Sequence, residues 1–315
     1  AVYISKSGRP GPVVVDIPDD LQRENIDPSS LCSYIPDVTE VSNNAPSKKI
    51  SESIRLINQS KRPVVVLGWG IRLSQSEKEA LKFIEALEFP VLLSFAMRDF
   101  LESSSPLNVG SFGTHGTRYG NFTIQNADLV IVIGSRLDSK KSGSPPKDFA
   151  REAKKIIVDI DQSELNKFKN IGINVDVLLQ KDCKSFFREI NERFNEISIQ
   201  DIDPWRKQIN EWKSKFPICR PECSKDEALD PYFFVKTLSE VLAEGDILIS
   251  DTGCGLVWAA QAFEFKKHQR LIHAFNFTPM GYALPASIGA CFANKGKRVI
   301  CLTGDGGLQM NIQEL

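Results

Sequence analysis

Short apolar runs alternate along the chain with longer stretches in which apolar side chains recur every three or four positions. The short runs are typical of buried strands, and the recurring stretches are typical of amphipathic helices. In the middle of the chain, the predicted strands are residues 63–67, 90–95, 128–133 and 156–160. The predicted helices begin near Ser47, which can cap the first of them, near Ser76 and near Cys183.

These helices each present one apolar face. The faces are Ile50, Ile54 and Ile57; Ala80, Ile84 and Leu87; and Cys183, Phe186, Ile190 and Phe194. The alternation of strands and helices predicts an α/β fold with doubly wound parallel sheets. Ligands of such sheets bind beyond the carboxyl ends of the strands.

The alternation resumes after residue 230 and predicts a second sheet. Its strands are expected at 246–250, 271–274 and 298–302, with helices around Trp258 and over 281–293. Near the start, Val13-Val14-Val15-Asp16-Ile17 predicts one more buried strand, which Pro18 ends. Trp205 and Trp212 predict a short helix on a domain surface.

The chain of 315 residues is long enough for two or three folding units. We expect residues 1–24 to end one domain, 25–46 to form a linker rich in Pro, Ser, Asn and Asp, 47–194 to form a central nucleotide-binding-like domain, 195–229 to be a connector, and 230–315 to begin a last domain.

Composition and charge exclude several classes of partner. A net charge of −1 gives no reason to expect nucleic acid or an anionic membrane. An apolar run of about 18 residues is missing, and the start does not resemble a signal peptide, so we expect no membrane span and a cytoplasmic location. Seven cysteines, an odd number, predict reduced thiols. A metal at Cys219 and Cys223 would need two more ligands, so ordinary thiols are favoured.

Gly304-Asp305-Gly306-Gly307 directly follows a predicted strand. Glycines let the backbone approach a ligand closely, and the free N–H groups of a helix start favour an anion. Asp305 would repel a phosphate unless a cation lay between them, and Mg²⁺ bridging Asp305 to a diphosphate removes that conflict. The alternative is a surface turn rich in Asp and Gly.

The segment from Gly304 to Leu315, GDGGLQMNIQEL, resembles the start of the thiamine diphosphate motif in the acetolactate synthase family. The resemblance implies that Gly304, Asp305, Gly306 and Gly307 hold the cofactor, with Asp305 as a metal ligand. In the family the motif continues to an asparagine that is a second metal ligand. We expect that asparagine to lie outside this chain.

A second block, Thr278-Pro279-Met280-Gly281, is similar to the family segment whose central residue wedges the cofactor into a bent shape. The resemblance implies that Thr278 and Met280 contact the cofactor and that Met280 is a catalytic residue. A flexible, polarizable methionine suits that task. The alternative is a core methionine at a helix start.

A third block, residues 250–261, resembles the strand, loop and helix that bind the other end of the diphosphate. It implies Thr252, Gly253 and Cys254 as cofactor contacts. Synthases usually have Gln and His where Cys254 and Gly255 stand. This departure leaves a related 2-keto acid decarboxylase or carboligase as an alternative.

The start of the chain, SGRPGPVVVDIPDDLQ, resembles the last strand of the family's pyrimidine-binding domain. The catalytic glutamate of that domain lies upstream in the family. We therefore expect the chain to be a fragment truncated at both ends, without activity by itself.

The middle of the chain resembles the family's Rossmann-like (DHS-like) central domain, which holds FAD in the synthases. The implied flavin contacts are Gly68, Gly70, His115, Gly116, Gly134, Arg136, Asp159 and Asp161. Carboxylates suit ribose or adenine donors, and an arginine suits a diphosphate. A dinucleotide fingerprint at Gly68-Trp69-Gly70 fails because Leu73 occupies the third glycine position. Other family members keep this domain without a ligand.

Taken together, the resemblance implies thiamine diphosphate- and Mg²⁺-dependent carboligation of pyruvate to a second 2-keto acid, as in branched-chain amino acid biosynthesis. Such a transferase or lyase forms its active site between two subunits, so a homodimer or homotetramer is expected, with a regulatory subunit as a further option. A non-catalytic nucleotide-binding fragment is the remaining alternative.

Overall fold

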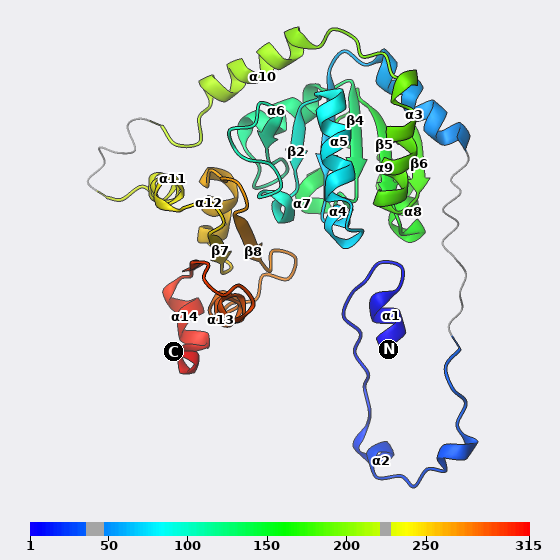
Figure 1. The fold of residues 1–315 in the computed structure, drawn as a ribbon, viewed down its shortest axis with the longest axis vertical. Coiled ribbons are helices and arrows are strands. Elements are labelled where there is room, and N and C mark those ends of the chain that lie inside the picture. Colours follow the sequence, from blue (N-terminus) through cyan, green and yellow to red (C-terminus); the bar gives the residue numbers. More distant parts are fainter. Residues whose placement is uncertain (36–46, 221–227) are drawn as a thin grey trace.

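The computed structural model describes residues 1–35, 47–220 and 228–315 (Figure 1). Within these ranges the chain forms two sheets, each packed between helices. The larger sheet has six strands in the order β3-β2-β1-β4-β5-β6, and the smaller has three in the order β8-β7-β9. Neighbouring strands are parallel in both sheets. The predicted α/β fold with parallel sheets is confirmed.

The central unit contains the larger sheet. In chain order its elements are α3 (Ser47–Gln59), β1 (Pro63–Leu67), α4 (Gly70–Leu73), α5 (Glu77–Leu87), β2 (Val91–Leu93), η2 (Phe95–Met97), β3 (Asn108–Gly110), α6 (Arg118–Asn126), β4 (Leu129–Ile133), α7 (Ser139–Ser142), η3 (Pro146–Asp148), β5 (Lys154–Asp159), α8 (Gln162–Asn170), β6 (Val177–Gln180), α9 (Cys183–Glu192) and η4 (Phe194–Glu196).

The C-terminal unit contains the smaller sheet. Its elements are α11 (Pro231–Val241), β7 (Ile247–Ser250), α12 (Cys254–Ala262), β8 (Arg270–His273), α13 (Ala283–Ala293), β9 (Val299–Leu302), α14 (Asp305–Met310) and η6 (Ile312–Glu314). Leu248 packs into a core with α11 and α12, whereas Ile247 and Ile249 pack with α13. This alternation follows the two-residue period of a strand, so helices cover both faces.

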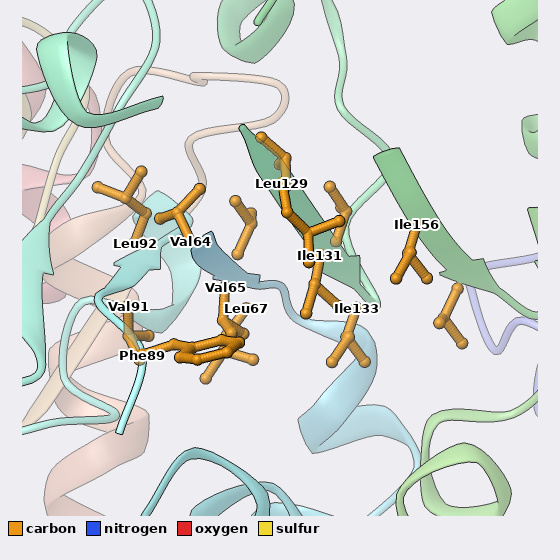
Figure 2. Packing of buried hydrophobic residues seen from close by; sticks show 14 of the residues in the cluster. Val64, Val65, Leu67, Phe89, Val91, Leu92, Leu129, Ile131, Ile133 and Ile156 are labelled. Carbon is orange, nitrogen blue, oxygen red and sulfur yellow. The ribbon is translucent and has the colours of Figure 1, made fainter. Parts of the chain in front are cut away.

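The central core surrounds β1 and β4, in which every residue is buried. Val64 and Val65 point to opposite faces of β1, so both faces of the sheet are filled with apolar side chains (Figure 2). The strand order reverses between β1 and β4, which makes the carboxyl ends of these two strands the switch point of a doubly wound sheet.

Two strands and several short helices of the central unit were not predicted. β3 begins with a polar residue, Asn108, and β6 alternates between buried and half-buried residues. They lie at the two edges of the sheet. Edge strands need fewer apolar residues, so their sequence signal is weaker.

The connector contributes α10 (Asp203–Lys215), which carries both predicted tryptophans. Trp205 is buried in the central core, and its indole Nε1–H donates to the Pro63 carbonyl oxygen over 3.0 Å. The rings of Trp205 and Trp212 meet edge to face. The predicted helix is confirmed, and Trp205 fixes it to the central unit.

The buried strand predicted at residues 13–17 is wrong. Val14 is 89% exposed, and no strand among the described residues pairs with this segment. Branched apolar residues form a strand only where a neighbouring backbone can accept and donate the ladder hydrogen bonds. Figure 1 shows this part of the chain, in blue, running apart from both sheets.

The N-terminal segment otherwise contains only α1 (Val2–Lys6), α2 (Asp19–Gln22) and the single turn η1 (Pro28–Ser30). Apart from η1, the predicted linker is irregular up to residue 35. The rest of it, 36–46, lies outside the described residues, as does the capping side chain of Ser47. Every helix among the described residues is too short or too polar to cross a membrane.

Candidate cofactor-binding site

Three loops that carry predicted cofactor contacts lie at one end of the smaller sheet. Residues 252–254 follow β7, residues 278–281 belong to the connection after β8, and residues 304–307 follow β9. Because the strands are parallel, their carboxyl ends meet at the same edge, where ligands of such sheets bind. The structure therefore brings the three predicted segments together.

Asp251 joins these loops and was not among the predicted site residues. Its side chain is buried at the end of β7, with the residue 2% exposed. One carboxylate oxygen accepts from the Thr252 N–H over 2.7 Å. The other accepts from the Gly281 N–H and the Thr303 hydroxyl, each over 3.1 Å. The sequence signal that could have identified it is a single acidic residue directly after a buried strand.

Close packing explains two of the glycines in these loops. A Cβ on Gly307 would lie 2.5 Å from the Asp251 carboxylate and 2.8 Å from the Thr303 hydroxyl. Gly281 has a φ of +83° and lies against Asn311, whose amide donates to the Gly281 carbonyl oxygen over 2.7 Å. Larger residues at either position would push the three loops apart.

Other positions in these loops face open space. A Cβ on Gly304 or Gly253 would meet nothing within 4 Å. Cys254 is exposed at the first position of α12. The site therefore presents free backbone and a thiol where the sequence predicts diphosphate contacts.

Met280 lies beside the glycine turn. The residue is 54% exposed, and its terminal methyl would be 3.1 Å from a Cβ on Gly306. Thr278 has a φ of +50°, a conformation that costs free energy in a residue with a branched side chain and that recurs in functional loops. The predicted methionine is thus an exposed side chain over the turn, and the alternative of a core methionine is wrong.

Asp305 is exposed at the start of α14, and one of its carboxylate oxygens accepts from the Gly306 N–H over 2.9 Å. Carboxylate oxygens are the ligands that Mg²⁺ prefers. Within residues 1–35, 47–220 and 228–315, no three acidic, histidine or cysteine side chains gather as a metal-binding group. Among the predicted site residues in these loops, Asp305 is the one with a carboxylate that could hold a metal.

The predicted flavin contacts of the central unit fall into separate groups. Gly68, Gly70 and Gly134 lie against one another at the switch point, where the Gly70 N–H donates to the Gly134 carbonyl oxygen over 3.0 Å. A Cβ on Gly68 would collide with the Gly134 carbonyl group. Contact between the loops after β1 and β4 is a sufficient reason for these glycines.

Asp159 and Asp161 have partners within the chain. Arg9 of the N-terminal segment forms an ion pair with Asp159 and lies 3.9 Å from Asp161. Asp161 also caps α8 by accepting from the Ser163 hydroxyl and N–H, and these hydrogen bonds lower the pKa of its carboxyl group. A ligand that needs these carboxylates must displace Arg9.

His115 and Arg136 contact the C-terminal unit, and Arg136 also lies near α8, whereas Gly116 lies against its own loop. The His115 carbonyl oxygen accepts from the Gln261 side chain over 2.7 Å, and its buried Nδ1 has no hydrogen-bond partner among the described residues. A Cβ on Gly116 would collide with the Phe112 backbone. Arg136 lies 3.5 Å from Asn276 and 3.6 Å from Glu164. These residues thus have contacts within the chain, and the Nδ1 of His115 is the one buried side-chain polar atom of theirs without a hydrogen-bond partner in the described residues.

The buried thiol of Cys183 lies in the core of the central unit. Burial raises the pKa of Cys183 to about 12, so its thiol stays protonated near neutral pH. Cys223, one of the two residues weighed as metal ligands, lies outside the described residues.

Two protein-family models match the chain. Residues 50–190 match the central domain of thiamine pyrophosphate enzymes, and residues 251–315 match their C-terminal TPP binding domain. Together the two matches cover more than half of the chain, and the second contains all three loops. The chain belongs to the thiamine pyrophosphate enzyme family. Its C-terminal match begins at Asp251, the residue that joins those loops.

Members of this family that resemble the chain include acetolactate synthases. It is 32% identical to the probable acetolactate synthase large subunit of Methanococcus aeolicus over 338 residues, covering 100% of the chain and 54% of that protein. It is 33% identical to acetolactate synthase 3, chloroplastic, of Brassica napus over 325 residues, covering 100% of the chain and 48% of that protein. The chain spans about half the length of the curated relatives it matches.

Proposed function

We propose that this chain supplies the diphosphate and metal half of an active site that joins pyruvate to a second 2-keto acid. The meeting of three loops around Asp251, at the carboxyl ends of β7, β8 and β9, is the observation that carries the proposal. The relatives that are named acetolactate synthases support the choice of reaction.

Each loop has a task in this proposal. Asp305 would hold Mg²⁺, and the backbone of residues 304–307 and 252–254 would bind the diphosphate. Met280, exposed above Gly306, would set the bend of the bound molecule. Thiamine diphosphate, when bound, supplies the carbanion chemistry for breaking and forming bonds beside a carbonyl group. The residues of this chain would bind and orient the cofactor, and Asp251 holds the three loops together.

Calorimetric titration of this chain with thiamine diphosphate and Mg²⁺ tests the binding step. We expect Asp305→Asn to weaken Mg²⁺-dependent binding by at least about tenfold, because a carboxylate is a far better Mg²⁺ ligand than an amide. Glu314→Gln, which removes an exposed carboxylate from η6, should bind like the wild type. Equal binding by all three proteins would refute the assignment of Asp305.

A related decarboxylase or carboligase is the second candidate function. Cys254 and Gly255 occupy positions where synthases usually carry Gln and His, and Cys254 is exposed at the start of α12. Product analysis of the complete protein with pyruvate separates the two candidates. Acetolactate supports the synthase, whereas acetaldehyde without acetolactate supports the decarboxylase. Measurable pyruvate turnover by residues 1–315 alone would contradict the expectation that this chain needs residues from elsewhere.

A flavin in the central unit is a further proposal. The unpartnered, buried Nδ1 of His115 supports it, whereas the pairing of Asp159 with Arg9 opposes it. Visible flavin absorbance that stays with the purified protein after gel filtration would support the proposal. Its absence even after reconstitution with FAD would refute it.

Association of two copies is also a proposal. The C-terminal unit exposes Phe277, Phe292, Met310 and Leu315. Burial of such side chains in a subunit interface would be favourable. Sedimentation equilibrium tests this directly: a dimer or tetramer is expected, and a monomer at micromolar concentration would contradict it.

A further inference from the structure

A cavity of about 460 Å³ lies where the central unit, the connector and the C-terminal unit meet. We call it the junction pocket. Its walls come from the loop after β2, from α6, α10 and α11, and from the end of α12. None of the residues 252–254, 278–281 or 304–307 lines it. Its size lies within the range of about 300–1,000 Å³ that is typical of small-molecule sites.

Arg98 is the central feature of this pocket. It is 4% exposed, and its Nε–H donates to the Ala260 carbonyl oxygen over 2.7 Å. One terminal guanidinium nitrogen, NH1, is buried without a hydrogen-bond partner among the described residues. Burial lowers the pKa of Arg98, yet an arginine remains charged near neutral pH. A buried cation that forms no ion pair is costly, and an anion in the pocket would lower that cost.

Three lysines, Lys213, Lys236 and Lys266, add to the positive charge. The ammonium group of Lys213 donates to the Asn108 carbonyl oxygen over 2.8 Å, and burial lowers its pKa. Lys236 lines the pocket from α11. In the described part of the chain, neither of these two lysines forms an ion pair, and neither does Arg98. Lys266 lines the pocket as well and forms no ion pair in the described part of the chain, so four positive groups line one cavity.

The pocket also contains acidic side chains. Glu102, Glu240 and Glu264 line it, and none of them forms an ion pair within the described residues. They would repel a molecule that is negative throughout. A suitable ligand thus has one anionic group for the cations and hydroxyl or amino donors for the carboxylates.

We propose that the junction pocket binds a small molecule through a carboxylate or phosphate group that Arg98 holds, with Lys213 and Lys236 supplying further charge. The planar guanidinium group matches either anion with parallel hydrogen bonds. The ligand also touches the end of α12, the helix that begins at Cys254 in the candidate cofactor site. Its binding does not depend on the proposed reaction.

Calorimetric titration of residues 1–315 tests the proposal with two probes of similar size. Glycerol 3-phosphate carries a phosphate and malate carries carboxylates, and both carry hydroxyl groups; glycerol is the uncharged control. We expect one of the two anions to bind saturably and glycerol not to bind. Arg98→Met should weaken that binding by at least about tenfold, the size expected for a buried arginine anchor.

Lys236→Ala keeps the test valid if Arg98→Met fails to fold, because only the backbone of Lys236, through its carbonyl oxygen, accepts a side-chain hydrogen bond among the described residues, and alanine keeps that carbonyl. We expect several-fold weaker binding and an unchanged melting temperature. Lys78→Ala, an exposed lysine on α5, is the matched control and should bind like the wild type. Asp305→Asn should also bind like the wild type, which separates this pocket from the candidate cofactor site.

Three results would overturn the proposal: no binding of either anion, binding that Lys236→Ala and Arg98→Met leave unchanged, or binding that Asp305→Asn abolishes.

Discussion

At the scale of single residues, the candidate cofactor site depends on fits between individual atoms. Asp251 accepts hydrogen bonds from two loops besides its own, and Gly307 lies so close to it that even a methyl group would collide. The Asp251 carboxylate therefore holds the site loops together, and the lack of a side chain at Gly307 allows their close packing. Substitutions at these two positions should affect the loops before anything else.

The first prediction concerns Gly307→Ala. The added methyl group would lie 2.5 Å from the Asp251 carboxylate, so the free energy of unfolding should fall by about 1–3 kcal/mol. Gly304→Ala is the matched control, because its Cβ would meet nothing within 4 Å and its φ of −84° suits alanine. Urea denaturation of the two variants measures the difference. Equal stability would contradict the packing described for Gly307.

The sequence predicted the glycine turn but not this reason for it. From the sequence, Gly304, Gly306 and Gly307 are glycines that admit a ligand, and only Gly304 is open in that way. The partner of Gly307 is a carboxylate at the end of another strand, and a single sequence does not show which strands are neighbours. Asp251 was missed for the same reason, since its hydrogen-bond donors come from distant loops.

At the scale of elements, the loop after β2 joins the central unit to the C-terminal unit. The Asp99 side chain is 0% exposed and accepts from Arg72 of the central unit. It also accepts from the Arg270 guanidinium over 2.9 Å and the Leu271 N–H over 3.1 Å, both on β8. One carboxylate thus connects β8 to the larger sheet. The apolar strands β1 and β4 were predictable to within a residue, whereas this connection was not, because it depends on polar residues in a loop.

Asp99→Asn tests that connection. The amide keeps the size of the side chain but removes the charge that faces two arginines, so we expect a loss of about 2–4 kcal/mol in the free energy of unfolding. Asp19→Asn removes an exposed carboxylate that pairs with Arg23 on the surface, and it should cost less than about 0.5 kcal/mol. Guanidinium denaturation compares them. Similar losses for the two variants would show that Asp99 does not join the units.

A third prediction concerns pH, through His273 at the end of β8. Its Nδ1 accepts from the Phe275 N–H over 3.1 Å, so Nε2 carries the proton that faces the Phe95 carbonyl oxygen. Burial lowers the pKa of this ring below its ordinary value of 6.5. The unfolded chain therefore takes up a proton at a higher pH than the folded chain does.

It follows that the free energy of unfolding falls as the pH is lowered through about 6.5, by at most about 1.4 kcal/mol per pH unit for one proton. Denaturation between pH 8 and pH 5 measures the slope. His273→Gln should remove this contribution, whereas His268→Gln, at an exposed position, should keep it. An unchanged slope in His273→Gln would assign the pH dependence to other groups.

At the scale of the whole molecule, the N-terminal segment is attached differently from the two units. Among the described residues, the hydrogen bonds and ion pairs between residues 1–35 and the rest of the chain all come from Arg9, which meets Asp159, Asp161 and Glu164. Its apolar side chains, Val14 and Ile17 among them, are exposed. The apolar run at residues 13–17 predicted a buried strand in this segment. Such a run shows that the residues can form a strand, but it does not show whether a neighbouring strand is present to pair with it.

Arg9→Ala should release the segment with little effect on the two units. We expect faster proteolytic cleavage within residues 1–24 and a change of less than about 1 kcal/mol in the global free energy of unfolding, since the ion pairs are partly exposed. Limited trypsin digestion followed by mass spectrometry measures the first, and urea denaturation the second. Lys6→Ala, in the same segment without an ion pair among the described residues, is the control. Unchanged cleavage in Arg9→Ala would mean that Arg9 does not hold the segment.

The position of Arg9 makes the N-terminal segment a tethered competitor. A tethered group acts at an effective concentration that is set by its tether and commonly reaches the millimolar range. Any nucleotide that needs Asp159 and Asp161 must compete with this covalently supplied cation, so its apparent affinity is lower than its contacts alone would give. Nucleotide binding to the central unit would then be coupled to release of the N-terminal segment, so a measurement of one would also report the other.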